Sequence, residues 1–381
     1  MRVLLCLLFS VSVASAQTVT SASGAFTHGS SNSLGGSSLG TKPTAYPVKW
    51  EDVTSCTLGG ALTTCSDPGP TWTVDSPLAP HPPIVSTATL RPGTPYTQNW
   101  RSQINGAELS PQGASFNYLT VPSFTKIYIN AWGYLDTSGR TGTIGNNKLF
   151  RITQTNAQAS NNDPAIAGDP TSFLSDWTLQ VDFNAGNDGH SQFFNAGPNL
   201  SSTRISNQWV HVEYMVDCGS CAAATDGLGL VNINEVTRYA LSSIAMIGTG
   251  QTGWQEVYWG GYANDNAGAW TGNYYENWDS IYFDTSFLRV VVCDTATYAA
   301  RTHCEIQIPT AWSSTAITFT ANRGSFATLV GAYAYVCTAP ATCSTNGFQL
   351  SADDATGPVR LRLTGLLFAG LLPIFWRRRH V

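Results

Sequence analysis

The feature that most constrains the fold is a series of short segments in which apolar and polar residues alternate. An alternation period of two is typical of β-strands with one buried face. Gly, Asn and Asp separate the segments, and apart from the two ends no stretch has a convincing helical period. The sequence therefore predicts an all-β protein, either a sandwich or a barrel. The segments are residues 126–134, 147–152, 177–183, 208–217, 227–233, 255–261 and 275–284.

Composition excludes several classes of protein. Only 11% of the residues are charged, and 19 Lys and Arg against 24 Asp and Glu give a formal net charge of −5. Nucleic-acid binding requires a basic surface, so no nucleic-acid partner is expected. Aromatic residues make up 11% of the chain, which is too many for a disordered protein. This composition, low in charged residues and rich in aromatic ones, suits an uncharged, β-rich extracellular protein.

The two ends indicate export and anchoring. Residues 1–16 have a basic start, a short apolar core and an Ala14-Ser15-Ala16 cleavage site, which together predict a signal peptide. Residues 351–381 are interpreted as a hydrophobic anchor, because the apolar run 363–376 is followed by three arginines. The run would span about 21 Å as a helix, which is short for a bilayer. We expect the main body outside the cell and the arginines inside; a buried C-terminal helix is the alternative.

The cysteines agree with export. Cys6 lies in the signal peptide, and the other eight fall into close pairs, which favours local disulfides. The Cys218-Gly-Ser-Cys221 motif could also bind zinc or act as a redox site, but a second matching pair and a βαβ context are both missing. A structural loop disulfide is the preferred interpretation. The pairs are Cys56/Cys65, Cys218/Cys221, Cys293/Cys304 and Cys337/Cys343.

Changes in composition divide the mature chain into regions. Residues 17–45 are rich in Ser, Gly and Thr and are interpreted as a weakly ordered linker. The alternating segments place the main β domain at residues 46–285. Residues 286–350 begin with a compact strand and contain two cysteine pairs, so they are interpreted as a small β appendage or stalk.

Residues 209–235 resemble a passage of the concanavalin A-like jelly rolls. In that family a W-x-H-x-E strand precedes a variable loop, and an Asp-Gly then opens the next strand, as Asp226-Gly227 does here. Residues 147–151 look like the N-x-K-x-x-R strand of the polysaccharide-lyase-like members, and residues 274–284 look like the closing strand. The C-terminal tail resembles the sorting tails of bacterial surface proteins. The resemblance implies a jelly-roll sandwich over roughly residues 46–285.

Two signatures of catalytic members are missing. The E-x-D-x-x-E motif of the glucanase-like members is absent, and no suitable pair of carboxylates shares one strand, which disfavours glycoside hydrolysis. The YFKxGxYxQ strand of the alginate-lyase-like members is also absent; residues 255–264 are the nearest segment and lack its Lys. Fold alone does not transfer an activity.

A lyase would use a cation to neutralise a uronate carboxylate and a His or Tyr to remove the α-proton. Arg151 and His211, with Tyr258 or Tyr262, would supply this chemistry. On its strand, His211 shares a face with Glu213, which could orient the imidazole and raise its pKa. The same pair could instead be buried between sheets or lie on a solvated outer face.

Carbohydrate binding needs aromatic platforms and polar side chains. Aromatic residues crowd residues 254–278, although strand aromatics commonly pack in a core. The candidate ligand-binding residues are Lys148, Glu213, Trp254, Trp259, Trp270 and Tyr275.

Calcium could bind in the Asn/Asp/Gly-rich loop 182–189, whose composition also suits any tight turn, and no other cofactor is expected. The resulting hypothesis is a surface-anchored protein that recognises extracellular polysaccharide. The alternatives are a lyase acting on a uronate-containing glycan and a structural surface or matrix protein.

Overall fold

A computed structural model gives the fold of this protein. It describes residues 17–75, 83–105, 113–114, 116–142, 146–153, 165–169, 178–182, 207–222, 224–247, 252–264 and 270–351. These residues are almost entirely β-strand and loop, with short 3-10 turns at Leu62–Thr64 and Tyr298–Ala300. The all-β prediction is confirmed for this part of the chain.

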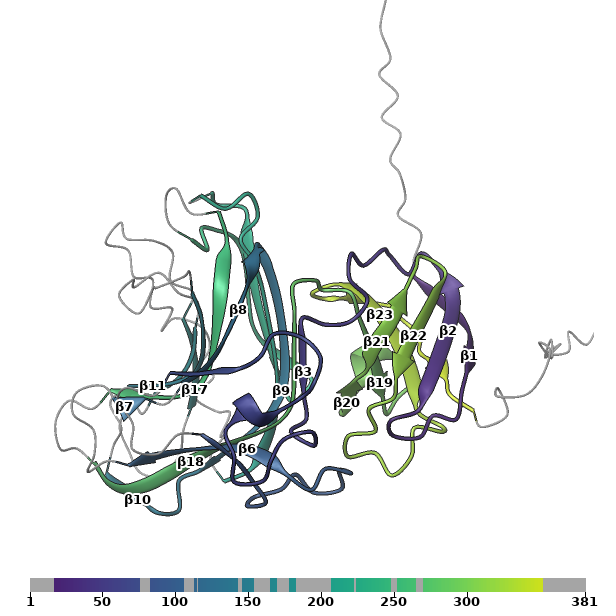
Figure 1. Cartoon of the computed structure of the whole chain (residues 1–381). Coiled ribbons are helices and arrows are strands. Elements are labelled where there is room, and N and C mark those ends of the chain that lie inside the picture. Colours follow the sequence, from purple (N-terminus) through teal and green to yellow (C-terminus); the bar gives the residue numbers. More distant parts are fainter. Residues whose placement is uncertain are drawn as a thin grey trace, which may run out of the picture.

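The described strands form four sheets, stacked as four layers (Figure 1). A seven-stranded and a nine-stranded sheet form the larger sandwich, at the left of the figure. A five-stranded and a four-stranded sheet form the smaller sandwich, at the right. The five-stranded sheet faces the nine-stranded one, because side chains from both meet in one buried cluster.

The larger sandwich is built from β3 to β18. The seven-stranded sheet has the order β13-β12-β11-β17-β8-β4, with β7 beside β17, and the nine-stranded sheet has the order β16-β15-β14-β9-β18-β6-β5, with β3 and β10 beside β18. The strands of the first are β4 (Thr73–Asp75), β7 (Gly113–Ala114), β8 (Phe116–Phe124), β11 (Asn146–Thr153), β12 (Ala165–Asp169), β13 (Thr178–Asp182) and β17 (Trp254–Asn264). Those of the second are β3 (Lys49–Glu51), β5 (Ile84–Ser86), β6 (Asn99–Asn105), β9 (Lys126–Asp136), β10 (Arg140–Gly142), β14 (Trp209–Asp217), β15 (Gly227–Ile233), β16 (Val236–Ile244) and β18 (Trp270–Asp284).

The smaller sandwich is built from both ends of the described chain. Its four-stranded sheet has the order β1-β2-β22-β21, and its five-stranded sheet has the order β20-β19-β23-β24, with β25 beside β23. The strands of the first are β1 (Thr18–Ser23), β2 (Ser31–Ser37), β21 (Ile308–Trp312) and β22 (Ala316–Thr320). Those of the second are β19 (Arg289–Cys293), β20 (Cys304–Ile306), β23 (Tyr333–Ala339), β24 (Thr342–Cys343) and β25 (Phe348–Gln349).

The interpretation of residues 17–45 as a linker is wrong. They contain β1 and β2, and Leu34 lies opposite Ile317 in the ladder between β2 and β22. Leu34 is buried with Phe26 in the core of the smaller sandwich. A Cβ on Gly36 would lie 2.0 Å from the carbonyl oxygen of Thr18, so the glycine permits the close approach of β1. The Ser/Gly composition that suggests flexibility therefore belongs to a strand with one apolar face.

The nine-stranded sheet is buried on both faces in its centre. Val212 and Tyr214 of β14 point into the core of the larger sandwich, whereas Met215 points toward the smaller sandwich. The five-stranded sheet alternates in the same way, with Val290 facing the four-stranded sheet and Val291 facing the nine-stranded one. Successive strand residues face opposite sides, so polar residues of the middle layers are buried too.

Four disulfides form among the described residues, and their pairing is the predicted one. They are Cys56–Cys65, Cys218–Cys221, Cys293–Cys304 and Cys337–Cys343. Each links residues close in sequence, so each closes a hairpin or loop within one sandwich. The Cys218–Cys221 bond follows β14 and leaves no thiol pair for a metal.

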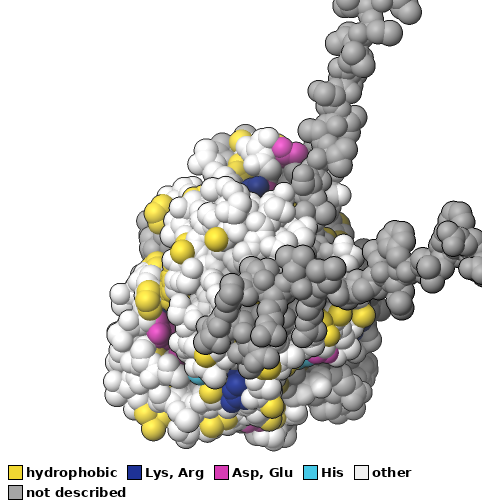
Figure 2. All heavy atoms as spheres, turned by 90° about the vertical axis from the view of Figure 1, so that its right-hand side faces the viewer, with side chains coloured by type: hydrophobic (Ala, Val, Ile, Leu, Met, Phe, Trp, Pro, Cys, Tyr) yellow, Lys and Arg dark blue, Asp and Glu magenta, His cyan; other side chains and the backbone are white. Residues whose placement is uncertain are grey.

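Viewed from the side of the smaller sandwich, the described surface has few charged side chains, and they are scattered (Figure 2). No helix in the described part of the chain is long and apolar enough to cross a membrane. The predicted signal peptide, residues 352–381 of the predicted anchor and most of the candidate calcium loop lie outside the described residues.

We expect Leu34→Ala to lower the free energy of unfolding by about 2–5 kcal/mol, because it leaves a cavity in the core of the smaller sandwich. Urea unfolding would measure this. Ser37→Ala, at an exposed position of the same strand, should change it by less than about 0.5 kcal/mol. Equal stability of Leu34→Ala and wild type would contradict the assignment of β2 to this core.

Candidate functional site

The predicted lyase residues Arg151 and Tyr258 are brought together in the seven-stranded sheet. Arg151 of β11 lies opposite Tyr258 of β17, and Tyr258 lies opposite Tyr118 of β8. Arg151 lies between Phe150 and Ile152, which are both buried in the core of the larger sandwich. By the alternation of the strands, the row Arg151–Tyr258–Tyr118 therefore occupies positions on the outer face of this sheet. Tyr118 lies outside the aromatic-rich residues 254–278, so the sequence does not single it out as a candidate.

Lys148 and Tyr262 form a second pair on the same two strands. They lie opposite each other beyond an irregularity in the ladder between Lys148 and Phe150. Trp270 lies opposite Gly142, at the start of β18. The structure describes the strand positions of Arg151, Lys148, Tyr258, Tyr262 and Trp270 but not their side chains.

His211 is not brought together with this row. It lies on β14 of the nine-stranded sheet, on the face that the smaller sandwich covers, and only 2% of its surface is exposed. Its Nδ1 lies 2.7 Å from Oε1 of Glu235, and its Nε2 lies 2.8 Å from Nδ2 of Asn130. Its ring stacks on Trp132 with centroids 4.8 Å apart. The prediction of His211 as a lyase base is therefore wrong, since no substrate reaches it in this packing.

Glu213 is also buried, and its role as a ligand-binding residue is corrected. Its Oε1 accepts a hydrogen bond from Tyr128 and its Oε2 accepts one from Asn232, at 2.7 and 2.8 Å. The guanidinium of Arg289 lies 3.6 Å away. Burial alone would raise the pKa of Glu213, but the charges of Arg289 and His211 lower it. The expected orienting contact with His211 is made by Glu235 instead.

Two of the predicted aromatic platforms belong to the core. Trp254 and Trp259 are 0% and 1% exposed. Trp259 stacks on Phe150 and meets Trp278 edge-on, with centroids 5.2 and 5.0 Å away. Because inward-facing residues of both sheets interdigitate here, these indoles are structural rather than ligand-binding.

Tyr275 differs from these tryptophans. It is partly exposed on β18, and the guanidinium carbon of Arg101 lies 3.8 Å from its ring centroid. A guanidinium over the face of a ring is a cation–π contact, so Arg101 covers one face of Tyr275. Tyr275 therefore lies on the outside of the larger sandwich, on a different sheet from Arg151 and Tyr258.

Arg91 joins the two sandwiches through buried ion pairs. Its Nε lies 2.9 Å from Asp279 of β18, and its Nη1 lies 2.9 Å from Glu305 of β20. Burial raises the pKa of Asp279 to about 6, against the effect of Arg91. Burial would also raise the pKa of Glu305, but Arg91 and the nearby His303 lower it to about 2. Glu305 is thus compensated more fully than Asp279, because His303 and the backbone of Ser325 act on it in addition to Arg91.

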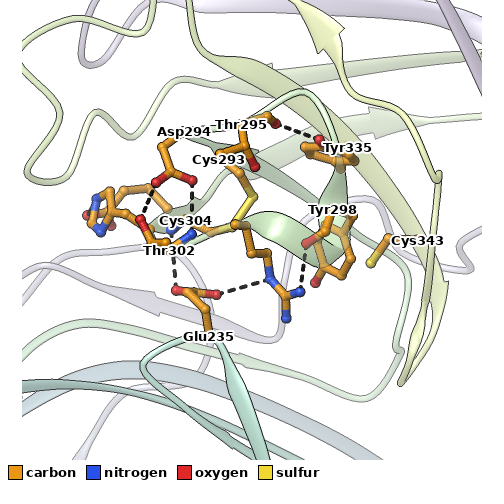
Figure 3. The surroundings of a disulfide bond; sticks show 12 residues. Glu235, Cys293, Asp294, Thr295, Tyr298, Thr302, Cys304, Tyr335 and Cys343 are labelled. Atoms are coloured by element: carbon orange, nitrogen blue, oxygen red, sulfur yellow. Dashed lines mark hydrogen bonds and ion pairs between the residues drawn. A yellow bond between two sulfur atoms is a disulfide. The ribbon is translucent and has the colours of Figure 1, made fainter.

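Glu235 makes a second bridge between the sandwiches (Figure 3). It lies in the hairpin turn between β15 and β16 and has a φ of 66°. Its Oε2 pairs with Nε of Arg301 at 3.3 Å, and its Oε1 accepts a hydrogen bond from the backbone of Cys304. A tight turn of this kind usually carries Asn-Gly. Asn234 can mark the turn in the sequence, but no local pattern around Glu235 or Arg91 indicates their partners.

One group of potential metal ligands occurs among the described residues, formed by Glu51, Cys56 and Cys65. Both sulfurs belong to the Cys56–Cys65 disulfide, so thiolates are not available to a metal. Glu51 is held by the Trp72 indole, which donates a hydrogen bond of 3.1 Å. This cluster is structural.

No family model and no curated protein matches the sequence. Among solved structures, the chain is similar to an endo-β-1,4-glucuronan lyase from the fungus Trichoderma reesei, with 12% identity and a TM-score of 0.40 over 60% of this chain and 94% of that one. It is similar to an alginate lyase from Aplysia kurodai, with 12% identity and a TM-score of 0.38 over 53% and 86% of the two chains. An alginate lyase from Chlorella virus matches with 10% identity and a TM-score of 0.37 over 55% and 92%. Similarity at this level identifies neither the activity nor the substrate of this chain.

We expect the His211–Glu235 pair to make stability depend on pH. Burial lowers the pKa of His211, but Glu235, Glu213 and Glu305 together raise it above its ordinary value of 6.5. A raised pKa in the folded state stabilises the protein below that ordinary value, and the contribution is lost as the pH rises through the folded-state pKa. Urea unfolding from acidic to alkaline pH should show a steeper decline for wild type than for His211→Gln. Parallel curves would contradict this.

Trp259→Ala should destabilise the protein by about 3–5 kcal/mol, because it removes a buried indole from the core of the larger sandwich. Thermal or urea unfolding measures this. Tyr275→Ala, at a partly exposed position, is the matched aromatic control and should have a much smaller effect. Unchanged stability of Trp259→Ala would show that this indole is not part of the core.

Proposed function

We propose that this protein is exported, is held at the cell surface by its C-terminal segment, and recognises an extracellular polysaccharide. We further propose that the larger sandwich is a concanavalin A-like jelly roll and that the glycan binds on the outer face of its seven-stranded sheet. The observation that carries this proposal is the row Arg151–Tyr258–Tyr118 on three adjacent strands.

The residue types in this row suit an acidic sugar. A guanidinium pairs with a carboxylate in a fixed, bidentate geometry, and phenol rings pack against sugar faces while their hydroxyls form hydrogen bonds. Adjacent strands lie about 4.8 Å apart, so a row across three strands offers a track wide enough for two or more sugar units. Uronate-containing glycans are therefore the favoured class.

The same row supports a lyase as a second candidate. Arg151 would neutralise the uronate carboxylate, one tyrosine would remove the α-proton, and another would protonate the leaving oxygen. This version replaces His211 by a tyrosine base, because the imidazole is buried beneath the smaller sandwich.

Export is supported by the disulfides and by the ends of the sequence. Local disulfides such as the four described here are typical of oxidising, extracellular compartments. The apolar run 363–376 and the arginines that follow it suit a membrane anchor with the body outside.

We expect Arg151→Ala to weaken binding to a uronate-containing oligosaccharide by roughly 10- to 100-fold, because a charge-assisted hydrogen bond is lost. Calorimetric titration against uronate and neutral oligosaccharides would measure this. Arg101→Ala removes a partly exposed arginine from the other sheet and should leave the affinity unchanged. Equal affinities of Arg151→Ala and wild type would place the binding site elsewhere.

An ultraviolet assay for unsaturated products separates binding from lyase activity. A lyase would produce a rising absorbance that Tyr258→Phe or Tyr118→Phe abolishes, while a binding protein would produce none. If no glycan in a broad panel binds and no product forms, the structural or matrix role remains.

A further inference from the structure

Lys42 and Asp284 form an unusual buried pair far from the candidate glycan row. Lys42 lies on the segment between β2 and β3, and Asp284 is the last residue of β18. The Nζ of Lys42 lies 2.5 Å from Oδ2 of Asp284, and their side chains are only 1% and 5% exposed. Charge-assisted N–H···O bonds are normally about 2.7–2.9 Å long. The two reactive groups are therefore held in contact and away from solvent.

Aromatic rings line this contact. The Nζ of Lys42 lies 5.9 Å from the ring centroid of Tyr282 and 5.8 Å from that of Trp312. Lys42 also donates a hydrogen bond of 2.9 Å to the carbonyl of Ala45, which fixes the position of the amine. Holding two reactants in contact in this way replaces a bimolecular encounter by an intramolecular one.

The burial favours the uncharged forms of both groups. Burial lowers the pKa of Lys42, although Asp284 opposes the shift. Burial raises the pKa of Asp284, and here Lys42 is the opposing influence. A neutral amine is a nucleophile and a neutral carboxylic acid can lose water, so both shifts are in the direction that condensation requires.

Neighbouring hydrogen-bond donors surround the carboxyl group. The backbone N–H of Thr285 donates to Oδ1 of Asp284 at 2.8 Å. The hydroxyl of Tyr282 donates to Oδ2 at 3.1 Å and lies 3.3 Å from the Nζ of Lys42. Thr285 is placed to stabilise an oxyanion on Oδ1, and Tyr282 is placed to carry a proton from nitrogen to Oδ2.

We propose that Lys42 and Asp284 condense into an intramolecular isopeptide bond. The Nζ of neutral Lys42 attacks Cγ of protonated Asp284, so that a C–N bond forms and Oδ1 carries the developing charge. The C–Oδ2 bond then breaks. Oδ2 already holds the proton of the acid, takes a second from the attacking nitrogen through Tyr282, and leaves as water. The product is an amide that retains one N–H, and no oxidant, reductant or co-reactant is consumed.

The geometry and surroundings of this pair differ from those of two other lysine–carboxylate contacts. Lys49 and Glu51 are also buried, but the Nζ of Lys49 lies 3.7 Å from Oε2 of Glu51, so these two groups are not held in direct contact. Lys126 and Asp217 lie 3.1 Å apart, but the Lys126 side chain is 49% exposed. An exposed lysine side chain is solvated and free to move, so its amine is not held against the carboxylate away from water. The Lys126–Asp217 pair is thus the matched control. The proposal is independent of glycan recognition, since neither residue belongs to the row Arg151–Tyr258–Tyr118.

The test is the intact mass of the purified wild-type protein, followed by reduction, digestion and peptide mapping. We expect a mass lower by one water than that of the chain with its disulfides, and a branched peptide in which Lys42 is joined to Asp284. A mass without this loss, together with separate unmodified peptides for Lys42 and Asp284, would overturn the proposal. This measurement needs no variant and so does not depend on any variant folding.

Variants then assign the bond to these residues. Lys42→Arg keeps the charge and Asp284→Ala removes the carboxyl, and each should restore the missing water. Lys126→Arg should keep the loss of water. If Lys42→Arg retained the loss, another pair of residues would form the bond and the assignment to Lys42 would be wrong.

Discussion

The arrangement of the molecule depends on the pairing of Arg91 with two carboxylates. Asp279 comes from the larger sandwich and Glu305 from the smaller one, and all three groups are almost completely buried. Charges buried in this way are strongly destabilising when one partner is missing, by about 3–5 kcal/mol. Other relative orientations of the two sandwiches would leave a buried charge unpaired. The sandwiches therefore meet in the orientation that brings both carboxylates to one guanidinium. The ion pair between Glu235 and Arg301 favours the same orientation at a second place between the sandwiches.

This orientation decides which residues are available for function. The smaller sandwich covers the face of the nine-stranded sheet that carries His211 and Glu213, so that residues resembling a catalytic pair become part of a structural network. The outer face of the seven-stranded sheet lies on the opposite side of the larger sandwich (Figure 1). The strand positions of Arg151 and Tyr258 belong to that sheet, away from the polar contacts that hold the sandwiches together.

The sequence predicts local features well and long-range ones poorly. Alternation locates β14 and β15 almost to the residue, and cysteine spacing identifies all four described disulfides. Alternation also places His211 and Glu213 on one face, but it does not reveal whether that face meets solvent or another sheet. Apolar alternation does not predict the strand β2, because only Asn32 and Leu34 of its residues are fully buried. The partners of Arg91 lie far from it in the chain, and no local pattern encodes them.

The position of β1 and β2 has a consequence for the order in which the chain acquires structure. The strand β2 pairs with β1 on one side and with β22 on the other, so the larger sandwich is inserted between the two parts of the smaller one. The partner of Leu34 follows it by about 280 residues, which at a synthesis rate of about 5–20 residues per second means a delay of roughly 15–60 s. During that interval the first strands have no sheet to join. Their Ser, Thr and Gly residues, with little exposed apolar surface, suit a segment that must wait in water without associating with other chains.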